Sequence, residues 1–410
     1  MRKLLQINTV VNFASTGKIA EALGKKAIEN EWLSFIAHGR HQKFSYSKTV
    51  HIGNRLDFYW HALATRIFDL HGLMSRSATK KLISEIESIQ PDLIHLHNLH
   101  GYFINFPLLF DFLATYNKPV VWTLHDCWSL TGHCTHFEQV GCFKWKEECH
   151  NCPQLKEYPR TLFFDRTRKN HRLKKKYFNK PNQLHVVTVS NWLKQQVMMS
   201  ILKNVPTSVI YNGIDTSIFR IEPNKTFKNT HNPEHKKIIL GVAGNWTANK
   251  GLDDFIKLRA ILEEDYLIVL IGLNTKQLKR LPKGIIGISR TESVKELVNW
   301  YNLADVYFNA SVEETFGMTS LEALACGTPI VVYNATACPE IVTEKVGRVA
   351  QKQNINDVRN HIKNIIEIGK ATFSETCSKY AHENFSSSNQ FDAYFKLYDA
   401  LLNKNDTVEQ

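Results

Sequence analysis

The sequence predicts an α/β protein built from two doubly wound halves, and three observations support this. Strand-length apolar runs recur along the 410 residues, as expected for parallel strands that are covered on both faces. Stretches with apolar residues at helical spacing separate these runs, for example residues 17–30 and 77–90. A polar stretch at residues 221–237, typical of a linker, divides the runs into two series. Two series of alternating strands and helices indicate two Rossmann-like domains.

The predicted strands can be placed in order along each half. The first series comprises residues 3–10, 33–39, 91–97, 119–126, 184–190 and 207–213, and the second comprises 237–244, 266–273, 284–289, 305–311 and 328–333. We therefore expect a first domain at residues 1–215, with an insertion at about 127–180, and a second domain at residues 216–384. The remaining residues, 385–410, are expected to form a helix that packs back on the first domain.

The composition is that of a folded protein. Hydrophobic residues make up 43% of the chain and charged residues 22%, which is enough apolar material for a large core. No apolar run approaches the roughly 20 residues that a membrane-spanning helix needs. The N-terminal run is interrupted by Gln6 and Asn8, and no small-residue cleavage site follows it. We interpret this run as the first strand of a cytoplasmic protein.

The formal net charge of +12 is unevenly distributed. Residues 156–180 contain ten Lys or Arg and two acidic residues, interleaved with aromatic side chains. Such a segment can bind anionic lipid headgroups, a polyanionic substrate or nucleic acid. It is also typical of the solvated face of a helix, so both interpretations stay open.

Polar residues gather where predicted strands end. His95, His97 and His100 lie at the end of one strand, and His125 with Asp126 lies at the end of the next. In open α/β sheets, ligands bind outside the carboxyl ends of the strands. With two such sheets facing each other, we expect the ligand in the cleft between them. The matching positions in the second half are residues 244–251 and Glu314, which also follow strands.

An ordered set of motifs resembles a known enzyme family. The motifs are TLHD, VSNW, VIYNGID, NKG and EETFGMTSLEALACGTPIV, in that order. The set is similar to that of the retaining glycosyltransferases of family four, which have the GT-B fold, and in particular to the bacterial branch that builds polysaccharide or O-antigen repeat units. The last motif is the most specific, because two glutamates, Phe-Gly and Gly-Thr-Pro occur in it together. The resemblance covers nearly the whole chain.

The resemblance assigns the last motif to the sugar donor. It implies that Glu314 touches hydroxyls of the donor sugar and that Glu322 touches the ribose of the nucleotide. A carboxylate can accept hydrogen bonds from two neighbouring hydroxyls, which suits both tasks. Backbone N–H groups at the start of the next helix would face the diphosphate. The donor-binding stretch that results is Thr315, Phe316, Gly317 and Met318.

Lys250 in the NKG motif is the expected cation for the diphosphate. Preorganised charge near a leaving phosphate can supply several kcal/mol of transition-state stabilisation. Relatives often carry an arginine six residues earlier, where this chain has Gly244, so the usual pair of cations is incomplete. Gly244 and Asn245 are nevertheless assigned to the donor side.

The first domain supplies the other candidate residues. His125 stands where the family has a histidine that contacts the donor sugar, and we count it as catalytic together with Lys250 and Glu314. Asp126 is either the base for the acceptor or a structural capping residue. The acceptor side is expected to be lined by His97, Asn98, His100 and Asp126. Gly17 resembles part of the glycine loop that these enzymes place near the donor phosphate.

Four cysteines within 19 residues form a separate group: Cys134, Cys142, Cys149 and Cys152. The Cys-x-x-Cys end matches one half of a zinc knuckle, and four thiolates could complete a tetrahedral zinc site. The other spacing is not that of a standard finger. Reduced core thiols and a disulfide are therefore alternatives to structural zinc.

The sequence thus predicts a retaining, hexosyltransferase-type enzyme. Its donor would be a UDP- or GDP-sugar, and its acceptor a glycan or lipid-linked oligosaccharide in cell-surface polysaccharide biosynthesis, such as O-antigen or capsule. No Asp-x-Asp stands at a strand end to hold Mg²⁺, so we expect no catalytic cofactor. In the family, front-face attack is assisted by the leaving phosphate.

The same residues also bear on other partners and functions. We expect a cytoplasmic enzyme that contacts the inner face of an anionic membrane and has no nucleic-acid partner. A nucleotide-sugar 2-epimerase shares the architecture but needs its own catalytic acids. A non-catalytic nucleotide-sugar binder would keep Glu322 while losing Glu314 or Lys250, and both of these are present.

Overall fold

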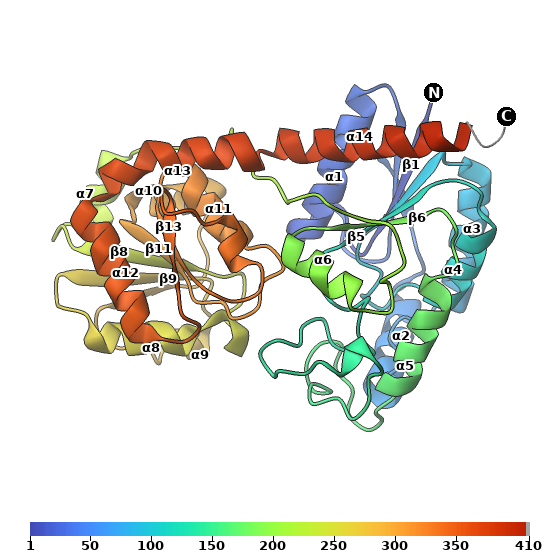
Figure 1. The fold of residues 1–410 in the computed structure, drawn as a ribbon, viewed down its shortest axis with the longest axis horizontal. Helices are drawn as coiled ribbons and strands as arrows, with labels where there is room; N and C mark the ends of the chain where they lie inside the picture. The colour runs from blue at the N-terminus through green and yellow to red at the C-terminus, as the bar shows by residue number, and fades with distance from the viewer. Residues whose placement is uncertain (407–410) are drawn as a thin grey trace. The chain divides into compact units, whose positions relative to one another are not determined.

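The computed structural model describes residues 1–406 and divides into two compact units (Figure 1). Unit 1 comprises Met1–Ile210 together with the chain from Phe391 onward, and unit 2 comprises Tyr211–Gln390. Each unit contains a parallel sheet with interleaved helices, which confirms the predicted α/β fold class. The division falls at Ile210, whereas the sequence pattern placed it at residue 215.

Unit 1 is built on a seven-stranded sheet in the order β3-β2-β1-β4-β5-β6-β7, and all neighbouring strands are parallel. Its strands are β1 (Lys3–Asn8), β2 (Leu33–His38), β3 (Lys48–His51), β4 (Leu93–Leu96), β5 (Val120–Leu124), β6 (Leu184–Thr188) and β7 (Thr207–Val209). The helices are α1 (Ala14–Glu29), α2 (Arg55–Phe68), α3 (Arg76–Ile89), α4 (Phe106–Thr115), α5 (Thr167–Phe178) and α6 (Asn191–Met198).

The core of unit 1 explains why its central strands are apolar throughout. Every residue of β4 and β5 is buried, because helices cover both faces of a parallel sheet. Helix α14 (Ser387–Asp406) contributes to this core from Phe391 onward. Its Tyr394, Phe395 and Tyr398 pack in one cluster with residues of β1, β4, β5 and β6.

Unit 2 contains a six-stranded parallel sheet in the order β10-β9-β8-β11-β12-β13. The strands are β8 (Lys237–Val242), β9 (Tyr266–Ile271), β10 (Ile285–Ile288), β11 (Val306–Asn309), β12 (Ile330–Tyr333) and β13 (Gly347–Ala350). The helices are α7 (Lys225–His231), α8 (Leu252–Ile261), α9 (Thr275–Leu278), α10 (Val294–Leu303), α11 (Met318–Ala325), α12 (Ile355–Ile368) and α13 (Lys370–Phe385).

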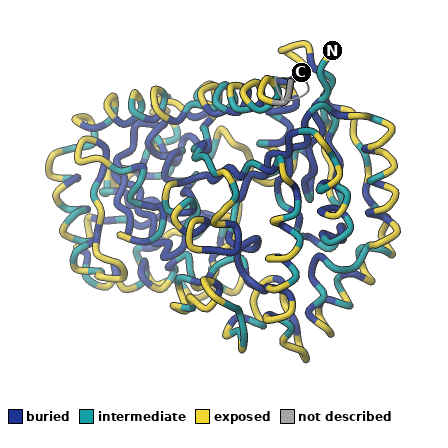
Figure 2. The backbone as a smooth tube through the Cα atoms, turned by 45° about the vertical axis from the view of Figure 1, so that its right-hand side comes forward, coloured by how far each residue is buried: buried dark blue, intermediate teal, exposed yellow. Residues whose placement is uncertain are grey.

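Burial follows this layering in each unit. The central strands of each sheet are mostly buried, and buried stretches of the chain are dark blue in Figure 2, whereas most exposed positions lie on helices and in loops. None of the helices within residues 1–406 is long and apolar enough to cross a membrane.

Three segments differ in detail from the sequence prediction. The stretch expected as a linker, residues 221–237, contains α7, whose Phe227 ring lies 5.1 Å from that of Trp300. The insertion expected at 127–180 holds a short 3₁₀ helix (Lys144–Lys146) and α5. Gly17 was expected in a loop but lies in the first turn of α1. A Cβ atom there would come within 2.9 Å of the Val10 side chain, so this glycine lets the helix pack closely on the loop before it.

Candidate functional site

In unit 2, the loop after β8 lies directly against the residues that follow β11. The amide of Val312 donates to the Asn249 carbonyl oxygen at 2.9 Å. Gly251 has a φ of +73°, and a Cβ atom there would lie 2.3 Å from the carbonyl oxygen of Ala310. Only glycine allows this approach, because a side chain would be strained by the backbone angle and would collide with the neighbouring backbone.

This contact brings Lys250 and Glu314 together. Lys250 Nζ lies 2.6 Å from Glu314 Oε1, and both side chains are largely buried. Burial alone would lower the pKa of Lys250, but the charge and hydrogen bond of Glu314 outweigh it and raise that pKa. The ammonium group therefore stays charged. Two residues 64 positions apart in the sequence thus form one charged pair, as expected of groups at neighbouring strand ends.

The backbone of Glu314 is held by the loop after β12. Its amide donates to Thr336 Oγ1 at 2.9 Å, and its carbonyl oxygen accepts from the amide of Ala337 at 3.3 Å. Thr336 has a φ of 50°, a conformation that non-glycine residues adopt rarely. Thr336 could not be predicted from the sequence, because nothing in the motif at 311–329 points to the loop that supports it.

The start of α11 has the geometry of an anion site. Gly317, the residue before the helix, has a φ of +100°, and a Cβ atom there would meet only the ends of two polar side chains, at 3.8 and 3.9 Å. The Phe316 side chain is buried, with its ring 5.7 Å from that of Tyr211 and 6.0 Å from that of Phe385. The first N–H groups of the helix have no intrahelical acceptor. An anion could therefore approach the backbone of Gly317 and Met318 closely.

Glu322 lies one turn further along α11. Its Oε2 accepts a hydrogen bond from the hydroxyl of Tyr301 at 2.8 Å. Burial, together with the charge of Glu322, raises the pKa of Tyr301 well above its usual value, so the hydroxyl stays a donor. Tyr301 orients the carboxylate and was not found from the sequence, where it reads as an ordinary core residue of α10.

The remaining donor candidates of unit 2 lie on its surface. Gly244 and Asn245 are exposed, and no atom lies within 4 Å of the position of a Cβ at Gly244. Thr315 and Met318 are half-buried on either side of the turn at Phe316 and Gly317.

In unit 1, the ends of β4 and β5 bring the predicted histidines together. The two strands are parallel neighbours, so the residues that follow them lie at the same edge of the sheet. Nδ1 of His97 lies 3.2 Å from Nε2 of His125, and Nε2 of His97 lies 3.0 Å from Oε1 of Gln6. Burial lowers the pKa of His97 well below its usual value and that of His125 to about 4, so both rings are neutral near pH 7.

The hydrogen bonds of Gln6 determine where the protons lie on His97 and His125. The Gln6 amide nitrogen donates to the Ala20 carbonyl oxygen, so its amide oxygen faces His97 and accepts. A neutral His97 that donates from Nε2 must accept at Nδ1. His125 therefore donates from Nε2, and its Nδ1 carries a lone pair. Gln6 fixes this tautomer and was missed because it lies inside a predicted strand.

His100 and Asp126 form a second pair beside the first. His100 Nε2 lies 2.6 Å from Asp126 Oδ2, and the other Asp126 oxygen accepts from the Trp128 amide at 2.9 Å. Burial would raise the pKa of Asp126, but His100 and the Trp128 amide outweigh it and lower that pKa to about 2. His100 Nδ1 also lies 3.2 Å from the hydroxyl of Tyr158.

These side chains line one pocket at the edge of the sheet of unit 1, which also includes Asn98 and Trp128. Asn98 is held by its backbone: its amide donates to Asn8 Oδ1 at 3.3 Å, and its carbonyl oxygen accepts from Thr9 Oγ1 at 3.0 Å. His95 does not join the pocket. It bonds to the hydroxyls of Tyr398 and Thr123 at 2.6 and 2.7 Å in the core, so its role is structural.

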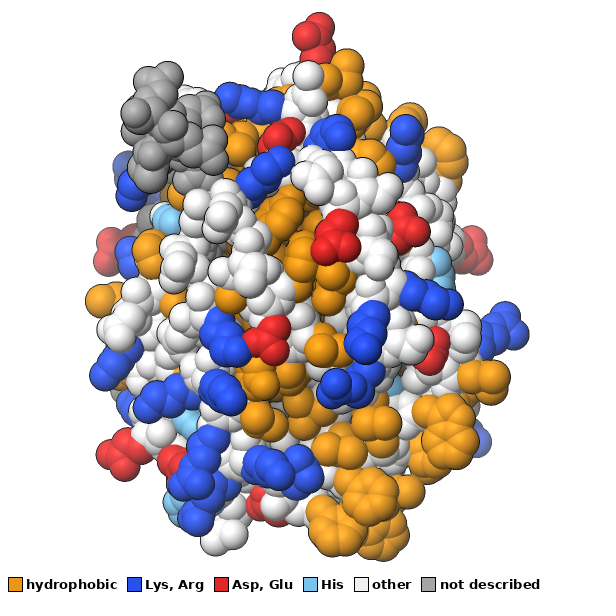
Figure 3. Space-filling model, turned by 90° about the vertical axis from the view of Figure 1, so that its right-hand side faces the viewer, with side chains coloured by type: hydrophobic (Ala, Val, Ile, Leu, Met, Phe, Trp, Pro, Cys, Tyr) orange, Lys and Arg blue, Asp and Glu red, His pale blue; other side chains and the backbone are white. Residues whose placement is uncertain are grey.

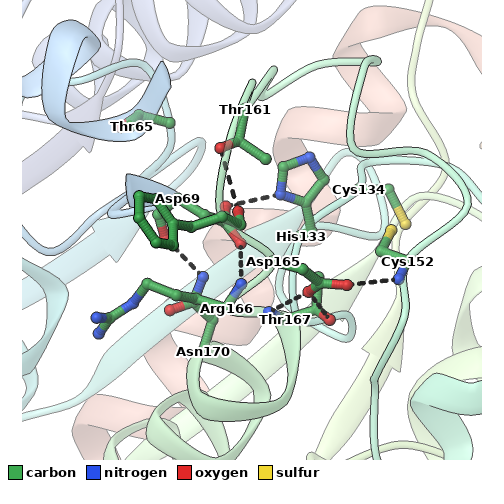
Figure 4. Close-up of polar contacts among 12 residues, drawn as sticks. Thr65, Asp69, His133, Cys134, Cys152, Thr161, Asp165, Arg166, Thr167 and Asn170 are labelled. Atoms are coloured by element: carbon green, nitrogen blue, oxygen red, sulfur yellow. Dashed lines mark hydrogen bonds and ion pairs between the residues drawn. The ribbon is translucent and has the colours of Figure 1, made fainter. Parts of the chain in front are cut away.

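The four cysteines of the insertion converge on one small pocket. A hydrogen bond between the thiols of Cys134 and Cys152 raises the pKa of Cys134 and lowers that of Cys152 to about 7, and the two sulfur atoms lie side by side in Figure 4. The amide of Gly132 donates to Cys149 Sγ at 3.2 Å. All eight cysteines are free thiols. Within residues 1–406, no group of three or more His, Cys, Asp or Glu has the arrangement of a metal site.

Comparisons with known proteins match this architecture. The family model for Glycosyltransferase Family 4 matches residues 18–218, and the model for Glycosyl transferases group 1 matches residues 223–384. The protein WcaC of Escherichia coli, named for glycosyl transfer in colanic acid biosynthesis, is 24% identical over 76% of this chain and 77% of WcaC.

Two further relatives match over shorter stretches. The capsular polysaccharide biosynthesis glycosyltransferase CapM of Staphylococcus aureus is 23% identical over 54% of this chain and 63% of CapM. The O-antigen chain mannosyltransferase RfbU of Salmonella typhimurium is 24% identical over 49% of this chain and 56% of RfbU. The chain thus spans between about half and three quarters of these relatives.

Solved structures share the fold at low sequence identity. Sucrose-phosphate synthase from Thermosynechococcus elongatus superimposes with a TM-score of 0.72 at 15% identity, over 98% of this chain and 100% of that one. HepE of Anabaena, solved with UDP and glucose, gives a TM-score of 0.69 at 16% identity over the same shares. The two family models, the two parallel sheets and these structures together show that this chain is an enzyme of the GT-B-fold glycosyltransferases that join a family 4 domain to a group 1 domain.

Proposed function

We propose that this enzyme transfers a sugar, with retention of configuration, from a UDP- or GDP-sugar to a glycan or lipid-linked oligosaccharide in cell-surface polysaccharide biosynthesis. The observation that carries the proposal is the Lys250–Glu314 pair beside the start of α11. It offers a cation and a carboxylate, from two separate loops of unit 2, beside the N–H groups at the start of a helix. WcaC, CapM and RfbU are named as glycosyltransferases of cell-surface polysaccharides, which supports a transferase with a glycan acceptor. Their names give no support to the epimerase alternative.

The donor would be held by unit 2 through three kinds of group. Lys250 and the N–H groups at the start of α11 bind the diphosphate, because both favour negative charge. Glu314 accepts from hydroxyls of the sugar, and Glu322, oriented by Tyr301, accepts from the ribose. Because Lys250 and Glu314 now pair with each other, a bound donor would share this pair between its phosphate and its sugar.

Unit 1 would supply the groups that orient the sugar and the acceptor. Burial keeps the His125 ring neutral near pH 7, and a neutral imidazole suits a hydrogen bond with a sugar hydroxyl such as that of the 6-position. Asp126 is ionised and already accepts from His100. We therefore favour Asp126 as a group that positions His100 over Asp126 as the acceptor base.

Catalysis then relies on fixed charge rather than on a side-chain nucleophile. Lys250 and the helix start stabilise charge that develops on the leaving diphosphate. The leaving phosphate accepts the acceptor proton in front-face attack, so Glu314 need not form a covalent bond. Enzymes of this family generally need no catalytic cofactor.

The enzyme would work in the cytoplasm at the inner face of an anionic membrane, where lipid-linked acceptors lie. We also propose that the four cysteines of the insertion bind one structural zinc ion. All four cysteines line one pocket, which supports this, and thiolates are preferred zinc ligands.

The zinc proposal predicts that purified protein carries about one equivalent of zinc by elemental analysis. Cys149→Ser should lower both the zinc content and the melting temperature, because structural zinc contributes to folding free energy. Cys377→Ser, at a buried thiol of unit 2, is the matched control and should keep the zinc. Metal-free protein of unchanged stability would show that the cysteines are ordinary thiols.

The transferase proposal is tested by a panel of UDP-, GDP- and dTDP-sugars. A true donor should raise the melting temperature, because a ligand that binds only the folded state stabilises it. The same donor should release nucleoside diphosphate when an acceptor glycan is added. Stabilisation without release on any acceptor would favour a non-catalytic binder.

A further inference from the structure

Helix α2 of unit 1 exposes its apolar side and buries its polar side. Leu56, Tyr59, Trp60 and Leu63 recur at helical spacing, and all four are exposed, Trp60 to 66%. The buried residues of the helix are His61 and Thr65. A helix that packs on a core normally shows the opposite pattern.

The buried polar residues explain how α2 keeps this orientation. His61 bonds through its two ring nitrogens to Ser75 Oγ at 2.8 Å and to the amide of Gly72 at 3.0 Å. Thr65 Oγ1 donates to the His61 carbonyl oxygen at 2.9 Å. The two bonds of the His61 ring therefore tie α2 to the chain that follows it, and the apolar side of the helix is left to face outward.

A loop of the basic segment extends the apolar surface. Leu162, Phe163 and Phe164 are all exposed, and the Phe164 ring stacks on that of Phe68 at the end of α2, with ring centres 5.5 Å apart. The amide of Leu162 donates to the Arg66 carbonyl oxygen at 2.7 Å. We call this surface the apolar face; it consists of Leu56, Tyr59, Trp60, Leu63, Phe68, Leu162, Phe163 and Phe164.

The loop is also anchored behind these residues. Asp69, the residue after α2, accepts from the Arg166 amide at 3.1 Å, and its carbonyl oxygen accepts from Asn170 Nδ2 at 2.8 Å (Figure 4). Asp69 also pairs with His133 at 2.8 Å. The two parts of the apolar face are therefore held in fixed positions on one rigid support.

Exposed arginines lie next to the apolar face along the chain. Arg55 and Arg66 are exposed on α2 itself, and Arg160 is exposed just before Leu162. Asp57, the acidic residue of α2, is engaged in a capping box with Asn54. Figure 3 shows apolar side chains gathered at the lower right of this side of the molecule, with Lys and Arg side chains beside them.

The basic segment itself divides between structural and surface roles. Lys174 of α5 is buried, and its Nζ donates to the carbonyl oxygens of Trp128 and Thr131. His171 is also buried. By contrast, Lys169, Lys175 and Lys176 are exposed and form no ion pair within residues 1–406. Only part of the segment is thus free to meet an external anion.

We propose that the apolar face docks on a lipid bilayer with anionic headgroups. Trp and Tyr favour the membrane interface, and an amphipathic helix with cations at its rim lies in that plane. The rim favours anionic lipid by charge. A second copy of the chain fits less well, because a two-fold contact would bring the two basic rims together. This inference rests on the proposed function, because docking would place the enzyme beside a lipid-linked acceptor.

The test uses full-length protein and vesicles of phosphatidylcholine with or without phosphatidylglycerol. Binding should require the anionic lipid and fall as salt rises. The double variant Tyr59→Ser/Trp60→Ser should lower the partition coefficient by about tenfold or more. Phe44→Ser removes an aromatic residue that is 71% exposed elsewhere on unit 1, and this variant should bind as the original protein does.

Trp60 also reports where the bilayer lies. Of the eight tryptophans, Trp60 is the exposed one, and the others are buried or half-buried. Brominated lipids should therefore quench the intrinsic fluorescence mainly through Trp60, and Trp60→Phe should keep vesicle binding but lose the quenching. Quenching that persists in Trp60→Phe would place the contact elsewhere and overturn the proposal.

Two other outcomes would also overturn it. Equal, weak retention by neutral and anionic vesicles would mean that the face does not bind lipid. A dimer in sedimentation that the Tyr59/Trp60 double variant abolishes would identify a second copy as the occupant. Thermal shifts with nucleotide sugars should be the same in the variants, so failure of docking can be told apart from failure of the proposed transferase function.

Discussion

At the scale of single residues, the sequence predicts the side chains of the donor site better than the residues that orient them. Glu314 and Glu322 were predicted from the motif at 311–329 and Lys250 from the NKG motif. The structure places Lys250 against Glu314. Tyr301 and Thr336, which orient the two glutamates, could not be found in this way. Each makes its contact across more than 20 positions of sequence, and a buried tyrosine or a loop threonine has many ordinary roles.

The assigned roles predict different failures for the two glutamates. Glu314→Gln should lower turnover by orders of magnitude and leave the affinity for nucleoside diphosphate nearly unchanged, because its contacts with the sugar matter most in the transition state. Glu322→Gln should weaken binding of the nucleotide sugar and of the free nucleoside diphosphate by roughly 1 to 3 kcal/mol, since a charged acceptor for the ribose is lost.

Calorimetry with the free nucleoside diphosphate separates these roles, because that ligand has a ribose and no sugar. Tyr301→Phe is the matched control for Glu322: it removes one donor to the carboxylate and should weaken nucleotide binding less than Glu322→Gln does. Equal loss of nucleotide affinity in the Glu314 and Glu322 variants would show that the pair has been assigned wrongly.

At the scale of elements, the apolar runs predicted every central strand and two of the four edge strands, β7 and β10. All eleven predicted runs contain a strand of one of the two sheets. The two strands that were missed, β3 and β13, lie at sheet edges. No residue of β3 is buried, so no apolar run marks it. Its pairing with β2 comes from backbone hydrogen bonds that any sequence can make.

The loop between β8 and α8 gives a prediction at this scale. Gly251→Ala should destabilise the protein by about 2 kcal/mol or more, because a positive φ costs roughly 1 to 2 kcal/mol and the added methyl collides with backbone. Lys250 should also move away from Glu314, which would weaken nucleotide binding. Chemical unfolding and calorimetry measure the two effects.

Gly244→Ala is the matched control for stability in the same loop. A methyl group there meets nothing within 4 Å, so its stability should change by no more than about 0.5 kcal/mol. If both variants were equally stable, the close approach of Gly251 to Ala310 would not be what positions Lys250.

At the scale of the whole molecule, the two units differ in their buried histidines. All the histidines with a lowered pKa in residues 1–406 belong to unit 1: His38, His61, His71, His95, His97, His125, His171 and His185. Burial is the main cause in each case. The sequence showed some of these histidines as candidates for substrate contact, but it could not show that most of them are neutral core residues.

This distribution predicts that unit 1 loses stability in mild acid before unit 2 does. A histidine whose pKa is lower in the folded state than in the unfolded chain holds its proton more tightly when unfolded. Its contribution is therefore complete above about pH 6.5 and is lost as the pH falls towards the folded pKa. Hydrogen exchange at neutral and mildly acidic pH should show protection falling first in peptides of unit 1, with unit 2 as the internal reference.

The variant His71→Phe measures how much one buried histidine contributes to this loss of stability in acid. Both ring nitrogens of His71 are buried and have no hydrogen-bond partner among the described residues, and the ring lies among those of Tyr102, Trp128 and Tyr158. The substitution therefore removes a titrating group and no hydrogen bond. One pH unit below the unfolded pKa, a histidine that stays neutral in the fold lowers stability by about 1.4 kcal/mol. The loss of stability of unit 1 on moving from neutral pH to one unit below 6.5 should shrink by about that amount in His71→Phe. An unchanged loss would mean that His71 is protonated in the folded protein, and that buried neutral histidines are not what makes unit 1 sensitive to acid.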